Sequence, residues 1–114
     1  MSSILKTLRL VADPTRVRIL MLLREEDLSV VELQDILAMG QSRISSQLSQ
    51  LKLAGLVADR RSGKNIIYRF EPPGEETGGD ALLSVIDLAA SELPEIAEDR
   101  AALRMALRKR KDRV

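Results

Sequence analysis

The stretch GQSRISSQLSQLKLAGLVADRRSGKNIIYRF, residues 40 to 70, decides the fold of this chain. In its first half, apolar residues recur at positions 44, 48 and 51, which is the spacing of one face of a helix. Small polar side chains occupy the opposite face. Its second half holds two β-prone segments on either side of a basic turn. A helix with a small polar face followed by a basic hairpin is the arrangement that places one helix in a DNA major groove and a wing beside it.

The polar face of the predicted helix is rich in serine. A face that meets only water would favour Glu, Lys and Arg, which have a higher helix propensity than serine. Ser, Gln and Arg side chains reach base edges and phosphates, and Arg43 is the best placed for a bidentate contact with guanine. The residues that we expect to bind DNA from this helix are Gln41, Ser42, Arg43, Ser45, Ser46, Gln47, Ser49 and Lys52. A solvated helix face is the alternative interpretation.

The hairpin is predicted from strands at 56–60 and 65–71, joined by the turn Arg-Ser-Gly-Lys and ended by two prolines. Its tip is basic, which favours contact with phosphates or with the minor groove. The residues that we expect to bind DNA from this wing are Arg60, Arg61, Lys64, Asn65 and Tyr68. Basic residues at a hairpin tip also keep a sheet edge from aggregating, which is the alternative interpretation.

Three helices are predicted ahead of this stretch. Apolar residues at helical spacing over 4–11 indicate a short first helix. Asp13 as a cap, with proline at the first helical position, starts a second helix whose apolar run 19–23 predicts the central core. Ser29 and Glu32 form a capping-box pattern that begins a third helix ending near residue 40. The few residues between the third and fourth helices fit a helix-turn-helix.

After the hairpin, residues 74–79 are predicted to be a flexible connector, and apolar residues again keep helical period over 80–93. Pro94 interrupts this helix, which can restart beyond it. The fold class is therefore mainly α with a small β-hairpin, a winged helix-turn-helix in the order α-α-α-α-β-β-α. We divide it into a DNA-binding region, 1–73, the connector, and a helical dimerisation region with a basic tail, 80–114.

A chain of 114 residues is too short to cover the apolar stripes of both its first and its last helix. We therefore expect a homodimer built on these two helices. Its expected interface residues are Ile4, Leu5, Leu8, Leu82, Leu83, Ile86, Ala89, Ala90 and Leu93. The predicted DNA-binding helices of the two protomers, about 34 Å apart, would then read a palindromic double-stranded DNA site.

The charges are unevenly distributed. Residues 1–70 hold 11 Lys/Arg and 7 Asp/Glu, residues 71–99 hold 9 Asp/Glu and no Lys/Arg, and residues 100–114 hold 7 and 1. A basic amino-terminal portion can meet DNA while the acidic stretch faces elsewhere. The basic end has three interpretations: a helix end favoured by the helix dipole, a sequence-independent grip on DNA, or a linker to a further domain.

Cysteine and histidine are absent from the sequence. Their absence excludes disulfides, thiolate or imidazole metal sites, and catalytic triads with a histidine base, so we expect no metal, no cofactor and no enzyme activity. No run of about 18 apolar residues predicts a membrane span, and the first residues lack the features of a signal peptide. The expected location is the cytoplasm.

Three segments together resemble the ArsR/SmtB family of winged-helix transcriptional regulators: ADPTRVRILMLL at 12–23, GQSRISSQLSQLKLAGLV at 40–57 and RRSGKNIIYRF at 60–70. They occur in family order and at family spacing, and the likeness covers roughly the first 70 residues closely. The resemblance implies a homodimeric repressor that occupies an operator. It also implies a recognition helix over Gln41 to Leu53 and a wing over Arg60 to Tyr68.

The sequence departs from this family at the sensory sites. Many members sense metals through a Cys-x-Cys pair at the start of the third helix, where this chain has Ser29 and Val31, and others use Asp and His pairs on the last helix. The resemblance therefore leaves a non-metal or unknown inducer. Two alternative functions stay open: an amino-terminal regulatory domain of a longer ArsR-like protein with a methyltransferase domain, and a winged-helix protein-interaction module.

Overall fold

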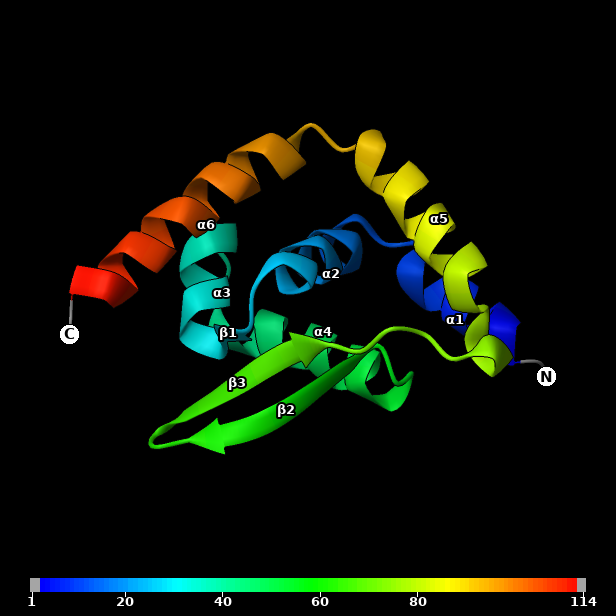
Figure 1. Cartoon of the computed structure of the whole chain (residues 1–114), viewed down its shortest axis with the longest axis horizontal. Helices are drawn as coiled ribbons and strands as arrows, with labels where there is room; N and C mark the ends of the chain where they lie inside the picture. Colours follow the sequence, from blue (N-terminus) through cyan, green and yellow to red (C-terminus); the bar gives the residue numbers. More distant parts are fainter. Residues whose placement is uncertain (1–2, 113–114) are drawn as a thin grey trace.

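The computed structural model describes residues 3–112 as a mainly helical fold with one small antiparallel sheet. The elements, in chain order, are α1 (Ser3–Val11), α2 (Pro14–Glu25), β1 (Leu28–Ser29), α3 (Val30–Leu37), α4 (Gln41–Leu53), β2 (Val57–Ser62), β3 (Asn65–Phe70), the 3-10 turn η1 (Glu75–Thr77), α5 (Gly79–Ser91) and α6 (Glu95–Asp112) (Figure 1). The expected class, a mainly helical chain with a hairpin wing, is confirmed.

The helix starts follow the predicted capping signals. The Asp13 carboxylate accepts a hydrogen bond from the Arg16 backbone N–H at 3.1 Å, and proline occupies the first position of α2. At α3 the Ser29 hydroxyl accepts from the Glu32 N–H, and the Glu32 carboxylate accepts from the Ser29 N–H. Each such cap stabilises its helix by about 1 kcal/mol, so these residues set where α2 and α3 begin.

The turn between α3 and α4 is short and sharply bent. Ala38 has φ 54°, the left-handed conformation with which helices commonly end, and α4 starts at Gln41. Gly55, with φ 76°, then ends α4 as predicted, since it allows the Leu56 N–H to bond back to the Leu51 carbonyl at 3.0 Å. The chain therefore turns directly from α4 into the hairpin.

The sheet contains one more strand than predicted. Its order is β1-β3-β2, with β1 pairing through Leu28 to Tyr68. A two-residue strand has no periodicity to read in a sequence, and this one forms only because β3 supplies a partner. The hairpin also extends farther than predicted: Ser62 still pairs with Asn65, and the two-residue turn uses Gly63 with φ 62°.

The carboxyl-terminal part contains two helices where the predicted order has one. Pro94 separates α5 from α6, because proline has no N–H to donate and its ring excludes a continuous helix. The segment 74–79, predicted as a connector, contains the η1 turn, which packs against α1. In Figure 1 the two helices form an arch over α2, and α6 also packs beside α3.

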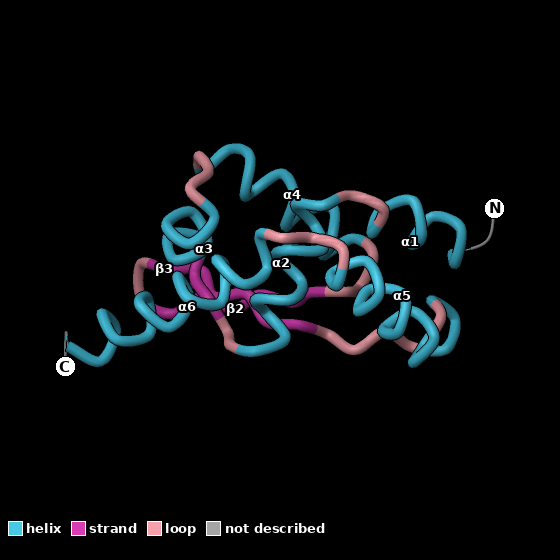
Figure 2. Tube along the Cα trace, turned by 90° about the horizontal axis from the view of Figure 1, so that it is seen from above, coloured by secondary structure: helices cyan, strands magenta, loops and turns pink. Residues whose placement is uncertain are grey.

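The core is centred on α2, as its apolar run predicts. The residues least accessible to solvent are Ile19, Leu20, Leu22, Leu28, Leu33, Ile44, Leu48, Leu51, Leu56 and Ile86. Seen from above, α1 and the end of α6 lie at opposite ends of the molecule (Figure 2). None of the helices within residues 3–112 has the length and apolar content needed to cross a membrane.

Candidate nucleic-acid interface

The orientation of α4 is fixed by its apolar face. Ile44, Leu48 and Leu51 are fully buried beneath it. The predicted binding residues lie on the remaining surface: Gln41, Ser42, Arg43, Ser46, Ser49 and Lys52 are exposed, whereas Ser45 and Gln47 are half-buried. The structure therefore brings the serine-rich face to the molecular surface on a rigid helix.

The amino end of α2 lies beside α4 and hydrogen-bonds to two of the predicted residues. An Arg43 Nη2–H donates to the Thr15 hydroxyl at 3.3 Å, and the Arg16 Nε–H donates to the Gln47 carbonyl oxygen at 2.6 Å. Neither Arg16 nor Thr15 is among the binding residues predicted from the sequence. Both hydrogen bonds join helices that are distant in the sequence, so the spacing of residues within either helix could not have indicated them.

Two other polar residues of α4 have partners close by. The Gln41 amide donates to the Ser45 hydroxyl at 2.8 Å, one turn along the helix. The Lys52 ammonium lies 3.0 Å from the Asp59 carboxylate on β2 and forms an ion pair with it. These contacts hold the ends of the polar face in defined positions and join α4 to the wing.

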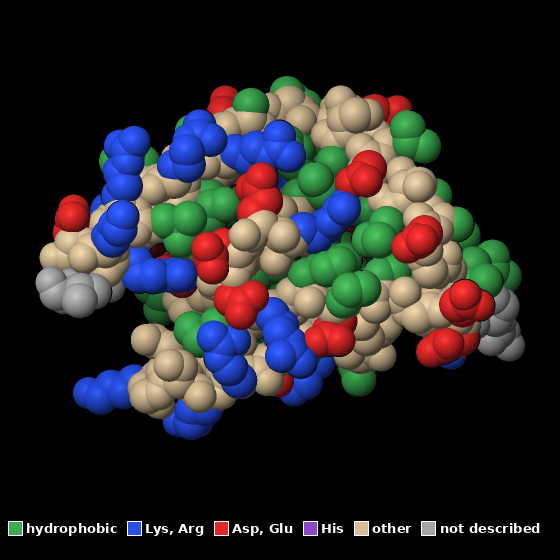
Figure 3. Space-filling model, in the orientation of Figure 1, with side chains coloured by type: hydrophobic (Ala, Val, Ile, Leu, Met, Phe, Trp, Pro, Cys, Tyr) green, Lys and Arg blue, Asp and Glu red, His purple; other side chains and the backbone are tan. Residues whose placement is uncertain are grey.

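The wing projects from the body next to α4, and Lys and Arg side chains gather at its tip along the lower left of Figure 3. Arg60 forms an ion pair with Asp27 at 3.1 Å. Arg61, Lys64 and Asn65 are exposed, and within residues 3–112 neither Arg61 nor Lys64 makes a side-chain hydrogen bond or ion pair. These two cations are available to an external anion.

The prediction that Tyr68 contacts DNA is wrong. Its side chain is 9% exposed and packs in the core, on the face of β3 opposite to that of Ile67. Burial raises the pKa of the Tyr68 hydroxyl, with a smaller contribution from the Asp59 carboxylate. Side chains alternate between the two faces of β3, and this strand packs against α2 and α3, so the face that carries Tyr68 is turned inward.

The predicted dimer surface is corrected on α5. Leu82, Ile86 and Ala90 are buried within this chain, because the face of α5 with the strongest apolar period is the one that packs on its own core. Leu83, Ala89 and Leu93 are half-buried. The exposed apolar side chains on the two helices are Ile4, Leu5 and Leu8 of α1, and Val85 and Leu88 of α5. The predicted interface residues of α1 are therefore accessible. On α5 the exposed apolar residues lie on the outer face and differ from the predicted ones.

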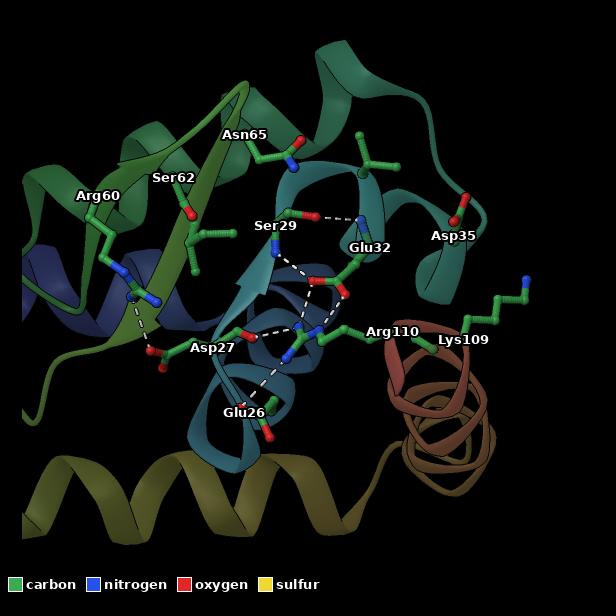
Figure 4. Close-up of a pocket in the computed structure, with 13 residues that line it drawn as sticks. Glu26, Asp27, Ser29, Glu32, Asp35, Arg60, Ser62, Asn65, Lys109 and Arg110 are labelled. Carbon is green, nitrogen blue, oxygen red and sulfur yellow. Dashed lines mark hydrogen bonds and ion pairs between the residues drawn. The ribbon is translucent and has the colours of Figure 1, made fainter. Parts of the chain in front are cut away.

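A cleft of about 420 Å³ lies between α3, the wing and α6. Figure 4 shows the Arg110 guanidinium inside it, bonded to the Glu32 carboxylate and to the Asp27 backbone carbonyl. Ser29 also lines the cleft, with its hydroxyl occupied by the helix cap. Across residues 3–112, no three Asp or Glu side chains are grouped in a way that could hold a metal ion.

Comparisons with known proteins agree with this architecture. A family model described as bacterial regulatory protein, arsR family, matches residues 13–59. The arsenic resistance transcriptional regulator ArsR1 of Pseudomonas putida is 40% identical over 77 residues, a stretch that covers 67% of this chain and 60% of that protein. The chain thus spans about three fifths of that relative's length. The uncharacterised HTH-type transcriptional regulator Rv0081 of Mycobacterium tuberculosis is 37% identical over 98 residues, covering 85% of this chain and 80% of the relative.

A solved structure is similar over the same region. The homodimeric winged helix-turn-helix DNA-binding domain Mb0332 of Mycobacterium bovis, described as a possible ArsR-family transcriptional regulator, superposes with a TM-score of 0.63 at 28% identity. The superposition covers 82% of this chain and 82% of that domain.

Proposed function

Because the chain belongs to the ArsR family of bacterial regulatory proteins, we propose that it is a homodimeric DNA-binding repressor of transcription. One observation carries the proposal: a helix with an exposed serine-rich face lies next to a wing whose tip presents cations without partners in the described chain. In this arrangement α4 enters the major groove and the β2–β3 wing lies along the adjacent backbone.

Direct base contact is assigned to the exposed face of α4. Ser42, Ser46 and Ser49 are short enough to let the helix approach the base edges closely, and each hydroxyl can donate or accept. Arg43 uses one nitrogen for Thr15 and retains further N–H groups for a guanine. These residues determine which base sequence is bound, whereas contacts to phosphates determine the position of the protein on the duplex.

The wing supplies the contacts to phosphates. Arg61 and Lys64 are exposed and require no internal ion pair to be broken, so they bind the backbone at the least cost. Asn65 lies beside them as a hydrogen-bond donor. Arg60 and Lys52 are held by Asp27 and Asp59 and contribute to binding only when those pairs are loosened.

The dimer is assigned to the exposed apolar residues of α1 and to the outer face of α5. Ile4, Leu5 and Leu8 together with Val85 and Leu88 give each protomer a surface whose burial is favourable. Homodimers are mostly related by a twofold axis, so the two α4 helices read the two halves of a palindrome. In this proposal α1 and residues 80–114 serve dimerisation, and the rest of residues 1–73 serves DNA binding.

The inducer in this proposal is something other than a metal held by thiolates or imidazoles. The chain has no Cys or His, and the Ser29 hydroxyl at the start of α3 already serves the helix cap. The same composition leaves no nucleophile paired with a histidine base, so we assign no enzyme activity. A protein that regulates bacterial transcription works where the DNA is, and we place it in the cytoplasm.

The proposal is tested by incubating the purified protein with fragments of its source genome and sequencing the fragments that it retains. We expect a small set of sites with a palindromic core. Affinity for the best site should fall steeply with salt, with log K decreasing by about 0.9 per phosphate contacted. A protein-interaction module would instead retain no specific fragment, and its weak DNA binding would show no sequence preference.

A further inference from the structure

Arg16 joins three helices at the edge of the proposed reading surface. It stands in the first turn of α2, where its backbone N–H bonds to the Asp13 cap. Its Nη1–H donates to the Leu10 carbonyl, in the last turn of α1, at 3.1 Å, and its Nε–H donates to the Gln47 side chain at 2.6 Å. The Arg16 and Gln47 side chains are both half-buried, so each is confined to a narrow range of conformations.

The contact between Arg16 and Gln47 determines which way the Gln47 amide faces. A guanidinium only donates hydrogen bonds, so the atom of Gln47 that meets Arg16 must be the carbonyl oxygen. The oxygen and nitrogen of an amide point in different directions from the same carbon. With the oxygen turned toward α2, the NH2 group is turned away from α2, along the surface of α4. The outward part of Gln47 is therefore a hydrogen-bond donor.

We propose that Arg16 is a positioning residue that sets base specificity, because it makes Gln47 a donor-only reader. The inference rests on the proposed function of α4. A free glutamine reads adenine by donating to N7 and accepting from the N6 amino group. A glutamine that presents only NH2 to the groove matches guanine, whose N7 and O6 both accept hydrogen bonds. Opposite adenine, the same NH2 donor faces the N6 amino group, which is also a donor, so that hydrogen bond cannot form. Arg16 thereby selects guanine over adenine without touching DNA.

The Leu10 contact gives Arg16 its fixed position. A carbonyl in the last turn of a helix lacks an intrahelical partner, so Arg16 satisfies an acceptor of α1 while it orients Gln47. Two separate anchors hold the guanidinium plane, and rotation of Gln47 requires the 2.6 Å bond to break. The specificity of α4 thus depends on a residue in α2 and on the end of α1.

The test is selection of bound duplexes from a randomised pool by the purified dimer, compared between wild type and variants. Wild type should enrich guanine at the position that Gln47→Ala leaves unspecified. Arg16→Met frees the amide, so adenine at that position should gain about tenfold relative to guanine, with the other positions unchanged. In the double variant, Arg16→Met with Gln47→Ala, the position should stay unspecified, because Arg16 acts only through Gln47.

Gln47→Glu is a second variant that keeps the partner of Arg16. The carboxylate still accepts from the guanidinium but has no NH2 group, so preference should move from guanine toward cytosine, whose amino group donates. Arg104→Met, an exposed arginine of α6 remote from α4, is the matched control and should leave the profile unchanged. Thermal unfolding followed by circular dichroism identifies any variant that fails to fold.

Three results would overturn the inference in distinguishable ways. If Arg16→Met lowers the affinity for all DNA sequences alike and the base preference stays that of wild type, Arg16 contacts a phosphate or has a structural role. The proposed function then stands. If Gln47→Glu retains the guanine preference of wild type, Gln47 does not read that base. If wild type enriches no sequence at all, the proposed function fails, and the role of Arg16 fails with it.

Discussion

Arg110, near the end of α6, donates hydrogen bonds of 2.7 and 3.0 Å to the carboxylate of Glu32, which belongs to the capping box of α3. Burial alone would raise the pKa of Glu32, but the bonds from Arg110 and Ser29 outweigh burial and hold it below its ordinary value. The last helix of the chain is thus joined to the first helix of the helix-turn-helix through one ionised carboxylate. The stability of this join depends on the charge of Glu32.

We expect Arg110→Ala to lower the free energy of unfolding by about 1 kcal/mol near pH 7, the upper range for an exposed ion pair. The pKa of Glu32 is lowered in the folded state, so its contribution is complete above its unfolded pKa and is lost as the pH falls through the folded pKa. The difference between wild type and variant should therefore shrink as the solution is acidified below about pH 4.5. Urea unfolding across this range measures it.

The control for this prediction is Arg108→Ala, because Arg108 is exposed on the same helix and makes no ion pair within residues 3–112. Its free energy of unfolding should equal that of wild type at every pH. A loss in Arg110→Ala that stays the same from neutral to acidic pH would contradict the assignment of Glu32. It would show that Arg110 stabilises through packing alone.

Asp99→Asn should be the most destabilising single change to a charged residue that we describe. The Asp99 carboxylate is 4% exposed and binds Arg18 through two bonds of 2.9 Å, joining α6 to α2. Removing one charge of a buried pair leaves the other uncompensated and costs about 3 kcal/mol. Denaturant unfolding should show this loss. The double variant, Arg18→Met with Asp99→Leu, should recover part of the lost free energy of unfolding. A double variant that loses as much as Asp99→Asn would contradict the explanation by an uncompensated charge.

The local signals in the sequence predicted much of the structure from α2 to the end of α4. The caps at Asp13 and Ser29, the inward face of α4 and the end of α4 at Gly55 all depend on residues within one or two turns of each other. Such interactions leave a pattern in the sequence because the spacing itself is the cause. The arrangement of the exposed face of α4 was predictable for the same reason.

The errors concern features that long-range packing decides. The burial of Tyr68 depends on the packing of β3 against α2 and α3, which are distant from it in the sequence. On α5 the apolar period shows which face is buried, but it does not distinguish the chain's own core from a second copy. Leu82 and Ile86 were therefore assigned to the dimer interface, whereas they pack in the chain's own core. Arg16 and Gln47 are 31 residues apart in sequence, beyond the reach of any helical period.

Leu88→Glu should convert the proposed dimer into a monomer. Leu88 is 69% exposed on the outer face of α5, so a charge there leaves the folded chain intact but cannot be buried favourably in an apolar interface. Sedimentation equilibrium should report half the mass of wild type. Affinity for a full palindrome should fall toward that for one half-site. The control is Met105→Glu, an exposed apolar residue of α6 that is 53% accessible. A dimeric Leu88→Glu would place the interface elsewhere.

Arg43 and Arg61 should affect DNA binding in different ways. Arg43 lies on α4 and can form a bidentate contact with a guanine, worth about 1–3 kcal/mol of discrimination, so Arg43→Ala should relax base preference at one position in each half-site. Arg61 is exposed on the wing, and the proposed function assigns it to phosphates, so Arg61→Ala should lower the affinity for all sequences alike and reduce the salt slope by about 1 for each phosphate that the variant no longer neutralises. Titrating each variant against single-substitution duplexes at several salt concentrations separates these effects. Equal and sequence-independent losses from both variants would show that Arg43 does not read a base.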